Sequence, residues 1–442
     1  MKSLSARRLV PACVLSAAAV AALVAPGAAN AGTLGEQCSG SSIIGKGSSL
    51  QKLAQQNVWD PDFNTSANPK ACNGTQGSKA TPKVTYESVG SGAGMEAWGI
   101  NAHAFEASTA YVGTDEPPNA AQRAEIQSHA KHPGESTLET IPVLQSSVAV
   151  FVRLPKLCAA TSTASPGRLV LDNVTLEKIF RGEITKWSEI TDNGDKLSGT
   201  GCAPESTITR IVRQDQSGTT SIFKKYLALI NPEKNVVGTA GWREISEGTH
   251  NTEWPGTVTK PTEKGGGPLV TLVNATPSSI GYANLAEVRS NGNFASPTGG
   301  LNTARFWVPI QNNGLEQEEE TYADPSSNGD AKELANSNCV NTEYTNGEVP
   351  FPPSSTLAVW NEVTTRTAET NYTLCGLTYD LSFHEFSQYP GMTLEEATSA
   401  NNFLRFELAA GGGQELIKKH DYLALPASLQ LEAAEGAEKS KF

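Results

Sequence analysis

Residues 213–219, which read Arg-Gln-Asp-Gln-Ser-Gly-Thr, combine the residue types that hold an oxyanion. The guanidinium of Arg213 offers a fixed positive charge with paired N–H donors, and the hydroxyls of Ser217 and Thr219 offer further donors. An apolar, strand-like run precedes this stretch and an amphipathic run with helical spacing follows it. The Ser-Gly-Thr turn is therefore expected to open a helix, whose first backbone amides have no intrahelical partner and can bind an anion.

Three earlier turns place small polar side chains after strand-like segments. Ser49 lies in a Gly-Ser-Ser turn, Ser91 lies in a glycine-rich turn, and Asp115 directly follows a short apolar run. In open α/β sheets, ligands bind at the carboxyl ends of the strands. We therefore expect these side chains and the turn at Arg213 to surround one small oxyanion from two sides of a cleft.

Five short motifs follow one another along the chain. They lie at residues 45–50, 89–94, 113–117, 171–187 and 213–219, and weaker matches at 279–282 and 422–426 continue the series. Their order and spacing resemble the phosphate-binding protein of bacterial ABC transporters, a periplasmic or secreted solute-binding protein. The resemblance implies an α/β, two-lobed periplasmic-binding-protein-like fold, with crossing strands between the lobes and phosphate enclosed in the cleft.

The resemblance also implies which residues bind the ligand and which partners the protein has. Asp215 would pair with Arg213 and orient its guanidinium. No cofactor, metal or catalytic residue is implied, and the expected partners are inorganic phosphate and a membrane permease, with the chain a monomer. The implied phosphate ligands are Ser49, the amide of Leu50, Ser91 and Asp115 in the first lobe, and Arg213, Ser217, Gly218 and Thr219 in the second.

An acid in an anion site has a physical reason. Phosphate still carries a proton at neutral pH and sulfate does not, so a buried Asp115 carboxylate can accept a hydrogen bond from phosphate alone. Sulfate would face Asp115 with no donor between the two charges, which costs on the order of several kcal/mol in a dry site. Asp115 is therefore predicted to select phosphate over sulfate.

The chain departs from the family pattern at three places. Leu50 stands where the family has an aromatic residue, and Glu116 stands where a small residue is common, which would add negative charge near the mouth of the cleft. Residues 291–353 are rich in Asn, Gly, Ser, Pro and acids, and they are expected to form a long surface insertion.

The first 31 residues have the pattern of a secretory signal peptide. Lys2, Arg7 and Arg8 precede an apolar run, and small residues end the segment. Cys13 lies too early in this run, and too close to Pro11, to indicate a lipoprotein. Removing one Lys and two Arg would move the formal charge from −12 to −15, and no basic patch then suggests nucleic acid. We expect an exported, soluble protein in the periplasm, at the cell surface or secreted.

The cysteine count fits export. Six cysteines remain after residues 1–31, which contain Cys13, are removed. An even number of cysteines in an exported chain indicates disulfides, although six cysteines allow fifteen pairings. No Cys-x-x-Cys spacing supports a zinc site. Pairing between sequence neighbours is the working prediction: Cys38 with Cys72, Cys158 with Cys202, and Cys339 with Cys375.

The remaining pattern alternates strands and helices, as in α/β proteins. The long apolar run at 141–154 is expected to be a strand that passes between the lobes. We also expect two short strands at 267–273 and 279–283, and a helix capped by Thr175. The final residues from 432 are highly charged and are expected to fray.

A chain of this length favours two lobes over a single core. The predicted layout is a signal peptide at 1–31, lobe 1 at 32–143 and 284–442, and lobe 2 at 144–283. The loop-rich insertion at about 291–353 falls within the second part of lobe 1.

Alternatives stay open at this point. A secreted phosphatase on the same lobes would need a nucleophile with a base, and neither Ser217 nor Ser91 has a histidine at a suggestive spacing. Another oxyanion could also replace phosphate in a pocket changed by Leu50 and Glu116.

Two further motifs are weaker. Residues 40–46 approach a nucleotide-binding loop, but Gly47 stands where a hydroxyl must hold magnesium. His129 and His132 have neither the spacing nor the third ligand of a metal site.

Overall fold

The computed structural model describes most of the chain beyond its first 39 residues. The predicted signal peptide and four of the predicted disulfide cysteines (Cys38, Cys72, Cys158 and Cys202) lie outside the described residues. The described residues are 40–64, 82–134, 137–155, 169–192, 195–196, 206–230, 235–237, 240–256, 262–291, 294, 305–311, 322–327, 337, 339 and 371–439.

One eight-stranded sheet carries the fold. Its strand order is β2-β1-β3-β16-β4-β12-β7, with β13 also paired to β4. Strands β1 (Ile43–Gly47), β2 (Val84–Ser88) and β3 (Thr109–Thr114) run parallel, so the turns that follow them meet at one edge. Strand β16 (Cys375–Phe383) runs antiparallel between β3 and β4.

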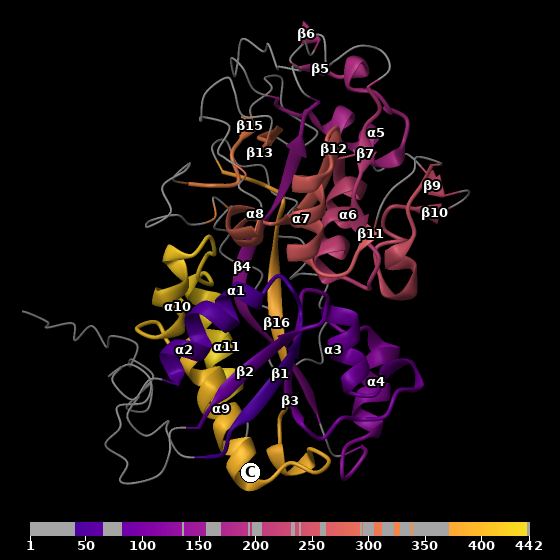
Figure 1. Ribbon diagram of the computed structural model, residues 1–442. Helices are drawn as coiled ribbons and strands as arrows, with labels where there is room; N and C mark the ends of the chain where they lie inside the picture. The colour runs from indigo at the N-terminus through magenta and orange to yellow at the C-terminus, as the bar shows by residue number, and fades with distance from the viewer. Residues whose placement is uncertain are drawn as a thin grey trace, which may run out of the picture. The chain divides into compact units, whose positions relative to one another are not determined.

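Strand β4 (Leu138–Arg153) connects the two parts of this sheet, and it is drawn beside β16 in Figure 1. Nine of its first ten residues pair with β16, the register skipping Val143, and its last six pair with β12 (Ser279–Asn284). Fifteen of its sixteen residues are buried, which explains the continuous apolar run in the sequence. The prediction of a long strand that passes from one part of the fold to the other is confirmed.

The other elements are short strands and the helices that flank the sheet. The strands are β5 (Thr191–Asp192), β6 (Asp195–Lys196), β7 (Thr209–Arg210), β8 (Val212–Arg213), β9 (Asn235–Val237), β10 (Ala240–Gly241), β11 (Thr262–Glu263), β13 (Arg305–Trp307), β14 (Ile310–Gln311) and β15 (Tyr322–Ala323). The α-helices are α1 (Lys52–Ala54), α2 (Asp60–Phe63), α3 (Ser91–Ala97), α4 (Ala120–Ser128), α5 (Asn173–Arg181), α6 (Gly218–Ile230), α7 (Gly266–Ala275), α8 (Leu285–Asn291), α9 (Leu394–Leu408), α10 (Gly413–Leu416) and α11 (Ala427–Lys439). A π-helical turn, η2 (Gln55–Trp59), joins α1 to α2, and 3-10 turns lie at η3 (Ile100–Ala102), η4 (Trp187–Glu189), η6 (Gly248–Thr252), η8 (Phe386–Gln388) and η9 (Ile417–Lys419). Along the described parts of the chain, no helix combines the length and apolar character that crossing a membrane requires.

The predicted strand at residues 267–273 is wrong, because this segment belongs to helix α7. Leu269, Val270 and Val273 are spaced for one helix face and pack into a common cluster. Pro268 falls in the first turn, where its missing N–H costs no helical hydrogen bond. The apolar run was too short for its period to distinguish a strand from a helix.

Two helix ends differ from their predictions. Helix α5 is capped by Asp172, whose Oδ1 accepts from the amide of Thr175 at 2.7 Å, so Thr175 lies inside the helix instead of capping it. Helix α11 continues to Lys439 instead of fraying from residue 432. Ala433 and Ala437 are fully buried, and this packing holds the charged tail in helical form.

The predicted surface insertion is wrong for two described stretches within it. Strand β13 pairs with β4, and Trp307 is fully buried against Phe151 and its neighbours. Residues 322–323 form β15, which pairs with β14. The predicted disulfide between Cys339 and Cys375 is confirmed, with a Cα–Cα distance of 5.9 Å. The predicted lobe boundaries stay a prediction.

Candidate functional site

Arg213 ends strand β8, as the sequence predicts, and its guanidinium is held at three points. Nε donates to Oδ1 of Asp215 at 2.7 Å, and Nη2 donates to Oδ2 of the same carboxylate. Nη1 donates to Oγ of Ser49 at 2.9 Å. The predicted pairing of Arg213 with Asp215 is therefore present in the structure.

The charge on Arg213 is retained despite its burial, since the residue is only 2% exposed. Burial lowers the pKa of Arg213, but the paired carboxylate of Asp215 outweighs this effect, so the pKa lies above its ordinary value. Strand β8 reaches this position by pairing with β11. A permanent positive charge thus lies at the end of this strand.

Helix α6 begins two residues after Gln216, as predicted for the Ser-Gly-Thr turn. Ser217 Oγ accepts from the amide of Thr220 at 3.3 Å, and the amide of Gly218 donates to Ser91 Oγ at 3.3 Å. The turn is supported from behind by Asn251, whose Oδ1 accepts from the amide of Ser217 at 3.0 Å. The first amide of α6, that of Gly218, is therefore directed toward the turn that carries Ser91.

Ser91 opens helix α3, and its hydroxyl oxygen accepts two backbone amides. These are the amide of Gly218 and the amide of Asp115, the latter at 3.2 Å. The approach is close enough to require glycine at position 218. A Cβ there would lie 2.5 Å from Cβ of Asp115 and 2.7 Å from Oγ of Ser91. Residues from three motifs distant in sequence are thus in contact.

Asp115 follows β3 and is 1% exposed, yet it is rich in hydrogen bonds. Ser48 Oγ and Thr378 Oγ1 donate to its Oδ1, Thr378 at 2.8 Å, and Thr219 Oγ1 donates to its Oδ2 at 3.1 Å. Burial raises the pKa of Asp115, while the hydrogen bonds from Ser48, Thr378 and Thr219 and the charge of Arg213 oppose that shift. All three hydroxyl contacts favour the ionised carboxylate.

Ser49 and Leu50 complete the set of predicted ligands. Ser49 Oγ accepts from Arg213 and from the amide of Gly266 at 3.3 Å, so it joins β1 to β8 and α7. Leu50 is fully buried, and its amide donates to Ser48 Oγ at 2.9 Å. In this structure the Leu50 amide is therefore engaged within its own turn.

The structure joins the predicted residues in two hydrogen-bonded groups, one of Ser49, Arg213 and Asp215 and one of Ser91, Asp115 and the start of α6, and the charge of Arg213 favours the ionised form of Asp115. Sequence reasoning missed several of their partners. Thr378 lies on β16, 263 positions from Asp115, and nothing around it in the sequence resembles a motif. The missed contacts of these residues are Asn251, Gly266 and Thr378, whereas Ser48 lies in the predicted Gly-Ser-Ser turn.

Glu116 does not behave as the sequence suggested. Its side chain is buried, with the residue 8% exposed, and burial raises its pKa to about 8 although Lys225 opposes the shift. A carboxyl with this pKa is mostly neutral at pH 7. The prediction that Glu116 adds negative charge near the mouth of the cleft at neutral pH is therefore wrong.

A second buried acid lies behind Arg213. Burial raises the pKa of Glu287 to about 7, and the charge of Arg213 is the strongest opposing influence. Glu287 accepts from Asn284 Nδ2 at 2.9 Å and lies against Gly266, where a Cβ would approach Oε2 to 1.8 Å. This packing brings the start of α7, and with it the amide that contacts Ser49, close to the site.

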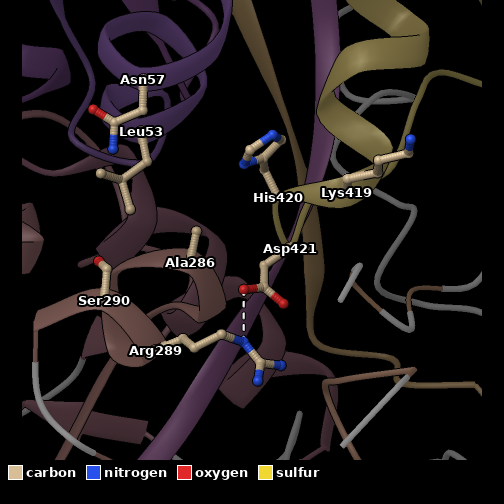
Figure 2. A pocket seen from close by; sticks show the side chains of 8 residues that line it. All are labelled: Leu53, Asn57, Ala286, Arg289, Ser290, Lys419, His420 and Asp421. Atoms are coloured by element: carbon tan, nitrogen blue, oxygen red, sulfur yellow. Dashed lines mark hydrogen bonds and ion pairs between the residues drawn. The ribbon is translucent and has the colours of Figure 1, made fainter. Parts of the chain in front are cut away.

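A separate hollow of about 280 Å³ is lined by residues of α1, η2 and α8 and by the end of η9 with the two residues after it (Figure 2). Leu53 and Asn57 face Ala286 there, and Arg289 Nε donates to Asp421 Oδ2 at 2.7 Å at its floor. None of the predicted ligand residues lines it. Within the described residues, no group of three or more His, Cys, Asp or Glu side chains is arranged to hold a metal ion.

Comparison with known proteins assigns this architecture to a family. Residues 36–336 match the family model of the PBP superfamily domain. Because this match covers more than half of the chain, the protein belongs to the PBP superfamily. The predicted α/β, periplasmic-binding-protein-like fold is confirmed.

Individual relatives agree with this assignment. The phosphate-binding protein PstS of Xylella fastidiosa (strain 9a5c) is 27% identical over 325 residues, which cover 73% of this chain and 72% of that protein. PstS of Haemophilus influenzae is 25% identical over 355 residues, covering 78% of this chain and 82% of the relative.

Solved structures show the same fold at lower identity. The phosphate-binding protein from Stenotrophomonas maltophilia superposes with a TM-score of 0.57 at 16% identity, covering 89% of this chain and 93% of that one. An ancestral soluble variant of the human phosphate-binding protein gives 0.56 at 19% identity, covering 88% and 92%.

Proposed function

We propose that this protein is an extracytoplasmic solute-binding protein that captures inorganic phosphate for import by an ABC transporter. The observation that carries the proposal is that Asp115, Ser91 and the start of α6 are hydrogen-bonded to one another, while the charge of Arg213, which is hydrogen-bonded to Ser49, acts on Asp115. A fixed cation, hydroxyls, helix amides and one acceptor carboxylate form a set that matches a protonated oxyanion. The phosphate-binding names of the relatives support the same ligand.

In the proposed complex, phosphate displaces the hydrogen bonds that now link these residues. Arg213 and the amides and hydroxyls of Ser217, Gly218 and Thr219 donate from one side. Ser49, the Leu50 amide and Ser91 donate from the other, and Asp215 keeps the guanidinium oriented. Asp115 is the acceptor for the proton that phosphate carries and sulfate lacks.

The wider setting belongs to the same proposal. The apolar N-terminal segment supports export, and the names of the relatives support a membrane permease as the partner. We propose that the protein acts as a monomer and without catalysis, because binding and release are all that delivery to a permease requires. The alternative of a phosphatase-like enzyme predicts turnover, which can be measured directly.

The proposal is tested by isothermal titration calorimetry of the purified protein with phosphate. Any bound anion is first removed by unfolding the protein in denaturant, dialysing it and refolding it. We expect one phosphate to bind per chain, and native mass spectrometry to show a matching mass increase. The same protein should release no product from a chromogenic phosphate ester. Absence of heat and of a mass shift with phosphate, or steady ester turnover, would contradict the proposal.

A further inference from the structure

The two oxygens of Asp115 have different environments. Oδ1 accepts from Ser48 and Thr378, both from the same side of the site as Asp115 itself. Oδ2 accepts from Thr219 at 3.1 Å, across the contact with helix α6. The Asp115 side chain is therefore fixed through Oδ1, and its Oδ2 is directed toward the proposed anion site.

The direction of the hydrogen bond from Ser48 follows from a backbone group. The amide of Leu50 can only donate, and it donates to Ser48 Oγ at 2.9 Å. The single hydroxyl proton of Ser48 is then available for Asp115, whose carboxylate can only accept when ionised. Ser48 is therefore a donor to Oδ1.

The same reasoning applies to Thr378 through Gln51. The side-chain nitrogen of Gln51 donates to the backbone carbonyl of Tyr379 at 3.0 Å, and a carbonyl can only accept, so the orientation of this amide is fixed. The same nitrogen donates to Thr378 Oγ1 at 2.9 Å. Thr378 has one proton left to give, and the ionised Asp115 at 2.8 Å is a stronger acceptor than the carbonyl of Thr114 at 3.2 Å.

Gln51 is itself held from behind by a buried network. Gln55 Nε2 donates to Oε1 of Gln51 at 3.1 Å and to Oε1 of Glu407 at 2.8 Å, and Tyr111 donates to Gln55 Oε1 at 3.0 Å. The acceptors on Gln51 and Glu407 lie at the nitrogen end of the Gln55 amide and the phenol of Tyr111 lies at its oxygen end, and together they set its orientation. The chain of donors thus ends at Oδ1 of Asp115.

We propose that Thr378 is a positioning residue that determines anion specificity. Because Gln51 donates to its hydroxyl oxygen, Thr378 must donate its own proton to Oδ1 of Asp115, and this hydrogen bond keeps Asp115 ionised. Oδ2 of Asp115 then remains the acceptor for the proton of phosphate. The inference rests on the proposed function and extends it to a residue outside the five sequence motifs. Without the Thr378 hydroxyl, Asp115 takes up a proton more readily. A protonated Asp115 becomes a donor and admits sulfate.

Other charged groups near Asp115 bear on its titration. Arg213 favours its ionised form, whereas the neighbouring Glu116 repels it when charged. Tyr86 and Tyr422, whose own pKa values are raised chiefly by burial, also face the charge of Asp115. None of these groups changes when Thr378 is replaced. A change in how the ratio of phosphate to sulfate affinity depends on pH therefore reports on the Thr378 hydroxyl itself.

The test compares Thr378→Val, which removes the hydroxyl and keeps the shape, with Thr378→Ser, which keeps the hydroxyl. Phosphate and sulfate affinities are measured by titration calorimetry between pH 6 and pH 8. For Thr378→Val we expect the ratio of phosphate to sulfate affinity to fall about tenfold relative to the wild type, the effect of losing one hydrogen bond to a charged group. The fall should grow toward pH 6, and Thr378→Ser should restore the wild-type ratio.

Two further variants keep the test decisive. Ser48→Ala removes the other donor to Oδ1 and should lower the ratio in the same direction, even if Thr378→Val does not fold. Ser382→Ala removes another buried hydroxyl from β16, remote from Asp115, and should leave the ratio unchanged. If both Thr378→Val and Ser48→Ala keep the wild-type ratio of phosphate to sulfate affinity at every pH, the inference is overturned and the proposed function is unaffected. A wild-type protein that does not bind phosphate would instead refute the proposed function.

Discussion

Replacing Gly218 by alanine perturbs the contact between the start of α6 and the turn that carries Asp115. The added Cβ would lie 2.5 Å from Cβ of Asp115, 2.7 Å from Oγ of Ser91 and 2.9 Å from Cα of Asp115. Carbon atoms in contact prefer a separation of about 3.5 Å or more. Because two of these three atoms belong to backbone or Cβ positions, the clash requires the two segments to separate by about 1 Å.

The size of the effect follows from this overpacking. Added methyl groups in well-packed sites typically cost about 1–3 kcal/mol. If that cost falls on the ligand-bound arrangement, the dissociation constant for phosphate rises roughly 5- to 140-fold, at about 1.4 kcal/mol for each factor of ten. The same close contact is present in the structure itself, so the protein should also lose stability before phosphate is added, by up to about the same 1–3 kcal/mol. The backbone adds no further cost, because position 218 does not have a positive φ and alanine favours a helix more than glycine does.

Titration calorimetry with phosphate and thermal unfolding without it measure the two expectations separately. Gly267→Ala is a matched control, since Gly267 also lies in the first turn of a helix and its added Cβ would have its nearest neighbour at an ordinary 3.4 Å. The control should bind phosphate as the wild type does. If Gly218→Ala and Gly267→Ala bind phosphate equally well, the close approach of α6 to Asp115 is not part of the binding arrangement, and the reasoning fails.

Two predictions concern stability. Burial raises the pKa of Glu116 to about 8 from an ordinary value of 4.5, so the folded chain keeps a proton that the unfolded chain releases, and the free energy of unfolding should fall between about pH 4.5 and pH 8. Glu116→Gln should flatten that fall in urea unfolding series, and an unchanged pH profile would argue against a buried, neutral Glu116. The disulfide between Cys339 and Cys375 closes a loop of 36 residues, and its reduction should lower the free energy of unfolding by about 4 kcal/mol. Denaturant unfolding with and without reductant measures this difference. Equal stability in both conditions would show that the cross-link does not reduce the conformational entropy of the unfolded chain.

Much of the candidate site could be predicted from the sequence, because its residues lie in short motifs at the ends of strands. Parallel pairing of β1, β2 and β3 brings the turns of Ser49, Ser91 and Asp115 to one edge, so local patterns sufficed for that half. Arg213 and Asp215 are two residues apart on a strand end, where a side-chain pair is readily inferred.

The remainder depends on packing that local patterns do not encode. Thr378 reaches Asp115 only because β16 inserts antiparallel beside β3, and its register is set by the whole sheet. The charge state of Glu116 depends on burial, which its acidic neighbours in the sequence do not reveal. The pattern of residues 267–273 predicts a strand because its four large apolar residues in seven fit both periods, and only the packing of Leu269 and Val273 shows that the segment is part of helix α7.

The most direct test of the central claim is the ratio of phosphate to sulfate affinity in the wild type and in Asp115→Asn at pH 8, measured by titration calorimetry. The wild type should prefer phosphate by at least about a hundredfold, since sulfate would meet a buried carboxylate without a donor. Asparagine can donate as well as accept, so the variant should bind sulfate more tightly and the ratio should approach one. Equal affinities for the two anions in the wild type, or an unchanged preference in Asp115→Asn, would contradict the claim that Asp115 selects the anion by accepting its proton.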